Sequence, residues 1–432
     1  MKLAIIGTGI SGLTCAHLLH REHDVTLYEA NDYIGGHTHT VDAEVAGETH
    51  SIDTGFVVFN DWTYPNFIGL LDELGVSSQP TSMGFSVRCE VSGIEYSGRN
   101  LSTLFAQKRN LFKGSHYRML LDILRFNHQG LNQWESLPDE MTVGEFLSRH
   151  HFSSAFADRY LLPMGAAIWS CPMLTFREFP IGFIIAFYKN HGLLNISNRP
   201  VWRVVQGGSR SYVDKLIRPF QDRIRLNSPV SRVMREGPGV RVISNGKAEG
   251  FDEVIFACHS DQSLLMLNDS TDTEREILSE FPYGKNTAVL HTDVQLLPQR
   301  RSTWSSWNYR VRSEEFRPSV TYNMNILQQI DAAETFCVTL NDEDRVDPSR
   351  KLGTFQYSHP IFTNRRAQVQ SRHAELIRQN RTSYCGAYWG NGFHEDGVTS
   401  ALRVCSAFGM LPKWSSEEVR TRDFVVTDGG AS

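Results

Sequence analysis

A glycine-rich turn between two apolar segments constrains the fold of this 432-residue chain more than any other feature. The letters GTGISG at 7–12 follow the apolar run Lys2–Ile6, which has the length of a buried strand. Residues 11–20 then carry apolar side chains at helical spacing, and a second strand-like segment ends at Glu29. Strand, glycine turn, helix and strand within about thirty residues are typical of the βαβ unit that binds dinucleotides.

Each glycine of the turn has its own physical role in such a unit. Gly7 permits the tight turn, Gly9 lets the backbone approach a pyrophosphate, and Gly12 lets the helix pack close to the strand. The N–H groups at the start of the helix hold phosphates, and an acid at Glu29 would accept hydrogen bonds from a ribose. The sequence therefore predicts that Gly7, Gly9, Gly12 and Glu29 bind a dinucleotide, and Ile10, Ser11 and Ala30, in the same two segments, are expected to belong to this ADP-binding half.

The segment after the acid favours FAD over NAD as the dinucleotide. The stretch EANDYIGGHTHT at 29–40 contains the glycine pair Gly35-Gly36, which would let the chain pass close to a pyrophosphate and a flavin. The chain has no second G-x-G-x-x-G, which a separate nicotinamide-binding unit would need. We therefore expect one FAD and no dedicated NAD(P)H domain.

Charge and cysteine usage exclude several other classes of protein. The net charge of −5 and the pI of about 6.4 argue against a nucleic-acid partner, which would favour a basic surface. Seven scattered cysteines without a C-x-x-C pair indicate reduced thiols in a cytoplasmic protein, not a zinc site or a disulfide framework. No metal is expected, because His37 and His39 are two histidines in a loop without further ligands.

The most apolar segment, Phe179 to Tyr188, leaves three interpretations open. The letters FPIGFIIAFY are too few to span a bilayer and include Pro180 and Gly182. The run could be plain core, the wall of an apolar tunnel, or a peripheral contact with a membrane surface. Two interpretations also remain for Trp169, which could belong to the core or line a substrate cavity. His394 could act as an acid or base, or it could make a structural hydrogen bond.

The order of patterns along the chain predicts a discontinuous arrangement of domains. The α/β pattern of the first 75 residues returns near residue 200 and again near residue 375. We expect a nucleotide-binding domain from 1–75, 200–270 and 375–415, and a substrate domain from 76–199 and 271–374. Residues 416–432 are polar and are expected to form a C-terminal tail.

Several motifs, in order along the chain, resemble the flavin-containing amine oxidase superfamily of monoamine oxidases, protoporphyrinogen oxidase and carotenoid desaturases. They are GTGISG at 7–12, EANDYIGGHTHT at 29–40, DTGFVVFN at 53–60, QGGSRSYVDKL at 206–216, DEVIFACHS at 252–260 and GAYWGNGFHEDG at 386–397. Other stretches, such as PMGAAIWSCP at 163–172 and WSSWNY at 304–309, are similar to a bacterial branch related to the flavoprotein half of plant cyclopropane fatty acid synthases. This resemblance implies an α/β plus α+β fold, with a Rossmann-type (GR2-like) FAD-binding domain and an inserted mixed substrate domain.

The resemblance also implies roles for further residues. The glycine-pair segment would run along the pyrophosphate and flavin, and the backbone of Val230 would pair with the adenine. A carboxylate of the last motif would meet the ribityl chain or the pyrophosphate, and the N-terminus of the final helix would point its N–H groups at the flavin. The residues implied are Gly35, Gly36, His37, Thr38, Gly55, Phe56, Val230, Glu395, Asp396, Gly397 and Val398.

The chain departs from the superfamily pattern at three positions, and the last two departures weaken the case for true amine oxidation. His37 stands where an arginine is common, and Ala288 stands where amine oxidases place a lysine near the flavin, with Lys285 three residues earlier. Gly392-Phe393 stands where a second tyrosine often covers the flavin. The sequence singles out no catalytic acid or base.

These observations favour an FAD-dependent oxidoreductase that moves a hydride from a substrate C–H to flavin N5. A lipid or fatty-acyl substrate, with the enzyme acting as a desaturase or oxidase, is favoured by the aromatic insert and the missing lysine. The alternatives are an amine oxidase for a small amine, a redox-neutral double-bond isomerase, and a non-catalytic FAD protein that partners a lipid methyltransferase. A cytoplasmic location is expected, with membrane association left open and the electron acceptor unassigned.

Overall fold

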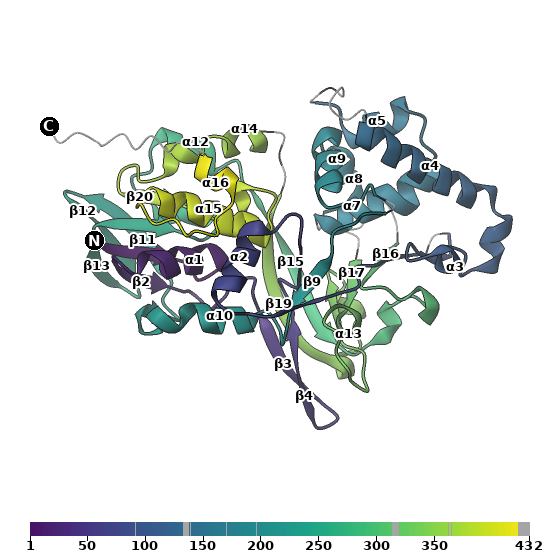
Figure 1. Cartoon of the computed structure of the whole chain (residues 1–432), viewed down its shortest axis with the longest axis horizontal. Helices are drawn as coiled ribbons and strands as arrows, with labels where there is room; N and C mark the ends of the chain where they lie inside the picture. The colour runs from purple at the N-terminus through teal and green to yellow at the C-terminus, as the bar shows by residue number, and fades with distance from the viewer. Residues whose placement is uncertain are drawn as a thin grey trace.

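The computed structural model describes residues 1–90, 92–132, 138, 140–169, 171–195, 197–312, 319–361, 363 and 365–421 (Figure 1). Its first unit is a five-stranded sheet in which all neighbours are parallel. The strand order across the sheet is β10 (Ile224–Arg225), β2 (Asp24–Tyr28), β1 (Lys2–Ile6), β14 (Glu253–Phe256) and β20 (Thr382–Tyr384). This confirms the predicted Rossmann-type unit and brings its strands together from three distant parts of the chain.

Alternating side chains of β1 serve two separate cores. Leu3 and Ile5 face the helices α1 (Ile10–Leu19), α10 (Arg210–Ile217) and α15 (His394–Ser406). Ala4 and Ile6 face a three-stranded antiparallel sheet of β11 (Val230–Glu236), β12 (Gly239–Ser244) and β13 (Lys247–Phe251). Because both faces are covered, β1 reads as a continuous apolar run, as buried parallel strands do.

A seven-stranded mixed sheet forms the second unit. Its order is β19 (Lys351–Pro360), β15 (Tyr283–His291), β18 (Cys337–Leu340), β17 (Ser319–Asn323), β16 (Trp307–Val311), β7 (Phe85–Cys89) and β8 (Ile94–Ser97). The neighbours β16 and β7 are parallel, and every other pair is antiparallel. The sheet therefore joins strands from before and after the helical insert.

A lobe of helices covers one face of this sheet and stands apart from α1, α10 and α15 (Figure 1). Its helices are α4 (Gly114–Asn132), α5 (Val143–Arg149), α6 (Ser154–Phe156), α7 (Leu162–Ile168), α8 (Met173–Arg177) and α9 (Ile181–Asn190). The apolar run at 179–188 supplies most of α9, whose side chains Ile184, Ile185 and Tyr188 are buried in the lobe. Of the three interpretations, the structure shows core packing for these side chains of α9, whereas Phe179, at the start of the run, also lines a cavity.

The chain also forms shorter elements. They are β3 (Thr40–Val45) with β4 (Glu48–Asp53), β5 (Val58–Asn60) with β9 (Trp202–Val205) and β6 (Ser78–Pro80), and the helices α2 (Pro65–Glu73), α3 (Leu101–Leu104), α11 (Ser260–Met266), α12 (Asp272–Leu278), α13 (Met324–Leu327), α14 (Arg366–Gln370) and α16 (Glu417–Thr421). Helix α16 occupies the start of the predicted C-terminal tail, whose remainder lies outside the described residues. Within the described ranges, no helix is both long enough and apolar enough to cross a membrane.

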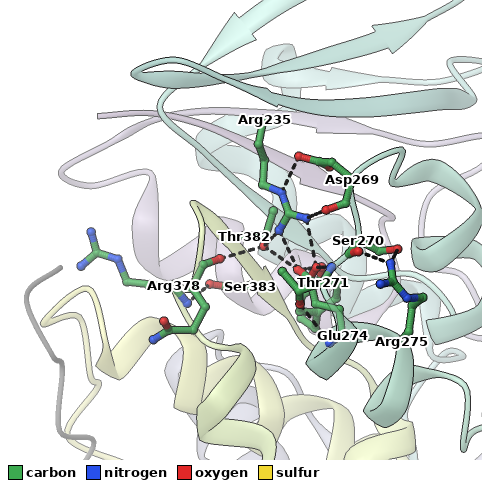
Figure 2. Close-up of polar contacts among 11 residues, drawn as sticks. Arg235, Asp269, Ser270, Thr271, Glu274, Arg275, Arg378, Thr382 and Ser383 are labelled. Atoms are coloured by element: carbon green, nitrogen blue, oxygen red, sulfur yellow. Dashed lines mark hydrogen bonds and ion pairs between the residues drawn. The ribbon is translucent and has the colours of Figure 1, made fainter.

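A buried ion pair fixes the three-stranded sheet to the rest of the nucleotide-binding unit (Figure 2). The guanidinium of Arg235 on β11 donates to both carboxylate oxygens of Glu274 on α12, at 2.7 and 3.0 Å. The same carboxylate accepts from the hydroxyl of Tyr384 on β20 at 2.7 Å. Burial is the largest single influence and would raise the pKa of Glu274, but the hydrogen bonds from Arg235, the Thr271 backbone and Tyr384, with the charge of Arg235, together hold the pKa below its usual value.

Candidate dinucleotide and substrate site

The fingerprint turn has the geometry that the glycines predict. Gly7 has φ +106°, and a Cβ there would lie 2.7 Å from the carbonyl oxygen of Ala257. A Cβ on Gly12 would lie 2.1 Å from the oxygen of Gly7, so only glycine lets α1 pack this close to the strand. Both positions therefore require glycine for the fold itself.

Gly9 differs, because the protein's own packing does not require a glycine there. Its φ of −68° and ψ of 176° suit any residue, and a Cβ would meet no heavy atom of the described residues within 4 Å. It forms the N-cap of α1, so the open space lies at a helix N-terminus, where free N–H groups favour an anion. A pyrophosphate fits this position.

The predicted glycine pair lies directly against this turn. Gly35 forms a parallel bridge with Gly9, and its N–H donates to the oxygen of Thr8 at 3.1 Å. Gly36 has φ +60°, and a Cβ there would lie 3.0 Å from the Cα of Gly9. Two segments that are separated in the sequence therefore enclose one backbone-lined space.

Glu29 and the start of β11 meet at the adjacent end of the sheet. The buried carboxylate of Glu29 accepts from the N–H of Thr8 at 3.0 Å and from the N–H of Asn31 at 2.9 Å. The N–H of Ser228 donates to the Glu29 carbonyl at 2.7 Å, which brings the half-buried Val230 to the same edge as the exposed Ala30. The ribose and adenine contacts of these residues remain predictions.

His37 carries a buried polar atom that the described residues leave unpartnered. Its Nε2 is inaccessible to solvent and has no hydrogen-bond partner among those residues. Burial, followed by the nearby His259, lowers the pKa of His37 to about 4, so the imidazole is neutral near pH 7. Since buried polar groups are normally paired, this atom fits a hydrogen bond to a bound dinucleotide.

Gly55 and Phe56 connect His37 to the last helix. The N–H of Phe56 donates to the His37 carbonyl at 2.7 Å, and a Cβ on Gly55 would lie 2.2 Å from the same oxygen. The Phe56 ring stacks on His394 at 3.5 Å between centroids, and Nε2 of His394 lies 2.9 Å from the Thr38 hydroxyl. His394 therefore takes part in structural hydrogen bonding, which is the second of the two interpretations given for it above.

The N-terminus of α15 adjoins α1. A Cβ on Gly397 would lie 2.7 Å from the Ile10 side chain, and the Ser11 hydroxyl donates to the Gly397 carbonyl at 2.9 Å. Val398, the next residue, is wholly buried between the helices. The first residues of both helices thus lie beside the glycine-pair segment.

The two acids of α15 have partners within the protein. Glu395 accepts from the backbone N–H groups of Asn66 and Phe67 at 3.0 and 2.8 Å and so caps α2. Asp396 accepts from the N–H of Phe393 at 2.8 Å. Burial raises the pKa of Glu395 to about 7 and that of Asp396 to about 6. Their predicted contact with the cofactor is not among these interactions and stays a prediction.

A cavity of about 210 Å³ lies between the helical lobe and the adjoining ends of β15 and β19. His359 lines it, and the His359 ring lies 5.4 Å from that of His37, so one residue of the cavity wall lies beside the segment that contains the glycine pair. Trp169 lines it as well, which supports the cavity interpretation of this residue. The walls include Trp169, Pro172, Phe179, Asn286, His359 and Ile361.

The polar groups of this cavity were missed by the sequence analysis. Asn286 donates to Nδ1 of His359 at 3.1 Å, and burial lowers the pKa of His359 to about 3. A lone asparagine and a lone histidine in strand-like segments give no signal of their own. Only the antiparallel pairing of β15 with β19 brings the two side chains together.

The strand geometry also settles where the candidate lysine lies. Lys285 is exposed, whereas its neighbour Asn286 is buried, so the two side chains lie on opposite faces of β15. Ala288 shares the face of Asn286 and is fully buried in an apolar cluster. No lysine and no carboxylate from the described part of the chain lines the cavity.

Comparison with known proteins identifies the family. Residues 10–298 match the model of the flavin containing amine oxidoreductases. The "Putative flavin-containing monoamine oxidase AofH" of Mycobacterium tuberculosis is 25% identical over 269 residues, which cover 58% of this chain and 55% of that relative. A zeta-carotene desaturase of Synechocystis is 37% identical over 76 residues, 17% of this chain and 15% of the relative. The chain thus spans about half the length of its longer curated match.

A solved structure extends the likeness over nearly the whole chain. The CLA-producing fatty acid isomerase from P. acnes superposes with a TM-score of 0.67 and 14% identity, and covers 94% of this chain and 98% of its own. At that identity the likeness shows the fold alone. Together with the family match, it confirms the resemblance and the fold class drawn from the motifs. The chain belongs to the flavin containing amine oxidoreductases, and its cofactor is FAD.

Proposed function

We propose that this FAD-dependent oxidoreductase takes a hydride from a C–H bond of an apolar substrate of the lipid or fatty-acyl class. The observation that carries the proposal is the cavity between the lobe and the ends of β15 and β19. It has apolar and aromatic walls, and one of its wall residues, His359, lies beside His37 in the segment expected to follow the flavin. FAD, when bound, supplies the hydride acceptor.

The chain's own residues would hold FAD along the two glycine segments. The N-terminus of α1 and the open space at Gly9 suit the pyrophosphate, and Gly36 passes next to it. The unpartnered Nε2 of His37 can donate one hydrogen bond, but a neutral imidazole adds no fixed charge. The phosphates would then be held mainly by backbone N–H groups.

The chemistry of the cavity walls favours an acyl chain over a small amine. An ammonium group that loses its water needs a carboxylate partner or it loses its proton. The cavity offers instead the amide of Asn286 and a His359 ring that burial keeps neutral. Burial of a methylene chain against Trp169 and Phe179 carries no such desolvation cost.

The proposal is tested by anaerobic mixing of the FAD-loaded protein with each class of substrate. Fatty acids and their esters are expected to bleach the flavin absorbance, and small primary amines are not. Bleaching by amines alone would refute the proposal. Conversion of an unsaturated fatty acid without net bleaching and without an electron acceptor would instead identify the redox-neutral isomerase.

A matched pair of substitutions tests the role of the cavity itself. Ile361→Asp places a carboxylate at a cavity wall, and Leu352→Asp places one at the opposite end of the same β-ribbon. The two wild-type side chains are 38% and 39% exposed, so both variants should fold. We expect Ile361→Asp to slow reduction by a fatty acid by roughly tenfold or more, since a charge near an apolar ligand costs over 1.4 kcal/mol. Equal rates in the two variants would show that the acyl chain lies elsewhere.

A further inference from the structure

A second cleft, of about 580 Å³, lies beside the strands β7 and β16. It forms where residues 294–304 pass over the sheet. Four arginines, Arg88, Arg301, Arg310 and Arg345, line it together with Trp304 and Gln299. Such a volume is typical of small-molecule pockets, which span about 300–1,000 Å³.

The cleft is on the other face of the sheet from the helical lobe. Val87 and Tyr309 are paired in register and are buried in the core of the lobe. Arg88 and Arg310 are the next residues along each strand, so their side chains point the opposite way. The sheet therefore separates this cleft from the apolar cavity at Trp169, which belongs to the lobe side.

Two of the arginines stand directly opposite one another on neighbouring strands. Arg88 and Arg310 are register partners, and like charges in this position are destabilising. Glu90 offsets part of the charge by accepting from Nε of Arg310 at 2.7 Å and lying 3.5 Å from Arg345. Glu95 lies 3.6 Å from Arg88. Asp342 lies 4.0 Å from Arg310 and also pairs with Arg312, so three carboxylates face four guanidinium groups before Arg301 is considered.

Arg301 adds a charge that no described carboxylate balances. It forms no ion pair with any residue that the structure describes, and its guanidinium lies 5.3 Å from the centre of the Trp304 ring. The neighbouring Asp342 is already paired with Arg312. Burial has the largest effect in lowering the pKa of Arg312, and the positive charges of Arg345 and Arg310 lower it further. Arg88 donates to the carbonyls of Gln295 and Leu297, and Arg310 donates to Glu90, so the cleft presents an excess of positive charge beside an aromatic ring, with the Arg301 guanidinium outside these pairs.

We propose that this cleft binds a phosphorylated small molecule of nucleoside diphosphate size, independently of FAD. Planar guanidinium forks bind phosphate in pairs of hydrogen bonds, which a lysine cannot reproduce. The half-buried ring of Trp304 provides a surface for a planar base next to the phosphate-binding groups. The cleft is too large for a single phosphate to fill, and its concave shape fits a small ligand.

The test uses the FAD-loaded protein from which free FAD has been removed, so that the dinucleotide site is already filled. ADP, pyrophosphate and adenosine are titrated separately by calorimetry. We expect saturable binding of ADP, weaker binding of pyrophosphate because it leaves Trp304 uncovered, and none of adenosine. Absence of ADP binding up to about 5 mM would overturn the proposal, since specific sites bind well below that concentration. Pyrophosphate binding as tight as that of ADP would overturn the placement of a base on Trp304.

Variants then locate the binding. Arg301→Gln and Arg345→Gln remove exposed guanidinium groups from the rim and should not disturb folding. Each is expected to weaken ADP binding by roughly tenfold, as loss of a charge-assisted contact does. Arg241→Gln, on the distant strand β12 where Arg241 pairs with Glu236, is the matched control and should change nothing. Unchanged affinity in both rim variants would place the ligand elsewhere and refute the assignment.

Discussion

Two glycines of the same turn should respond in opposite ways to a single methyl group. A Cβ on Gly9 meets no described heavy atom within 4 Å, whereas a Cβ on Gly12 lies 2.1 Å from the oxygen of Gly7. Gly9→Ala should therefore leave the FAD-free protein folded but fill the space meant for the pyrophosphate. Gly12→Ala should damage the fold itself, because α1 must move by about 1 Å against a well-packed sheet.

The magnitudes separate the two variants clearly. For the FAD-free protein, Gly9→Ala should change the free energy of unfolding by less than about 1 kcal/mol. Alanine is a weaker N-cap than glycine, which lowers stability, but it also makes the unfolded chain less flexible, which raises stability. Gly12→Ala should lose about 1–3 kcal/mol or more to overpacking. FAD at a hundred times its Kd should stabilise the wild type by about 2.7 kcal/mol, and Gly9→Ala should lose most of this.

Thermal unfolding with and without FAD measures both effects, and flavin fluorescence gives the Kd directly. Gly9→Ala should have the wild-type Tm in the absence of FAD and should show little rise in Tm when FAD is added. Gly12→Ala should have a lower Tm than the wild type already in the absence of FAD. Wild-type FAD affinity in Gly9→Ala would show that the open space at the helix N-terminus does not hold the pyrophosphate. A lowered Tm in the FAD-free Gly9→Ala protein would show that the space is needed by the fold.

Three further substitutions test other parts of the structure. Glu274→Ala removes the hydrogen bonds that join Arg235 to α12 and leaves Asp269 as the remaining ion-pair partner of the guanidinium, so it should cost about 1.5–3 kcal/mol in chemical denaturation, against under about 1 kcal/mol for the exposed pair in Arg241→Gln; equal losses would contradict the buried pairing in Figure 2. Because burial raises the pKa of Glu395 to about 7, its contribution to stability is present below its unfolded pKa near 4.5 and is lost as the pH rises through 7. Glu395→Gln should therefore flatten the fall in Tm between pH 5 and 8, and an unchanged slope would refute this origin. Lys285→Ala should leave the rate of flavin reduction within about twofold of wild type, because the side chain lies on the exposed face of β15; a larger loss in stopped-flow measurements would mean that this lysine reaches the substrate.

The nucleotide-binding unit could be predicted because its signals are local. The fingerprint at 7–12 specifies its own turn, and a buried parallel strand such as β14 reads as an apolar run. The glycine pair is also specified locally, since Gly35 and Gly36 adopt positive φ and only backbone separates them from Gly9. Such positions admit few residues other than glycine, so the sequence records them.

The acids of the last motif show where the residue type alone does not decide the role. A carboxylate of Glu395 or Asp396 is expected to meet the cofactor; in the structure the two side chains accept hydrogen bonds from the backbone of α2 and of Phe393, and their contact with the cofactor stays a prediction. A carboxylate near a helix start can serve a ligand or a helix N-terminus, and the residue type does not distinguish the two. Likewise His359 and Asn286 meet only through strand pairing, which depends on a register that no local pattern specifies.

Because side chains alternate along β7 and β16, the two faces of the seven-stranded sheet contribute to two different sites. One face carries Val87 and Tyr309 into the core that supports the cavity wall at Trp169, and the other carries Arg88 and Arg310 into the basic cleft. A one-residue shift of either strand would exchange the two faces and bury arginines in the lobe, which makes this register costly to change. Conservative changes at the rim of the cleft, such as Arg301→Gln, should therefore leave the apolar cavity intact, and ligand binding on one face can be measured without disturbing the other.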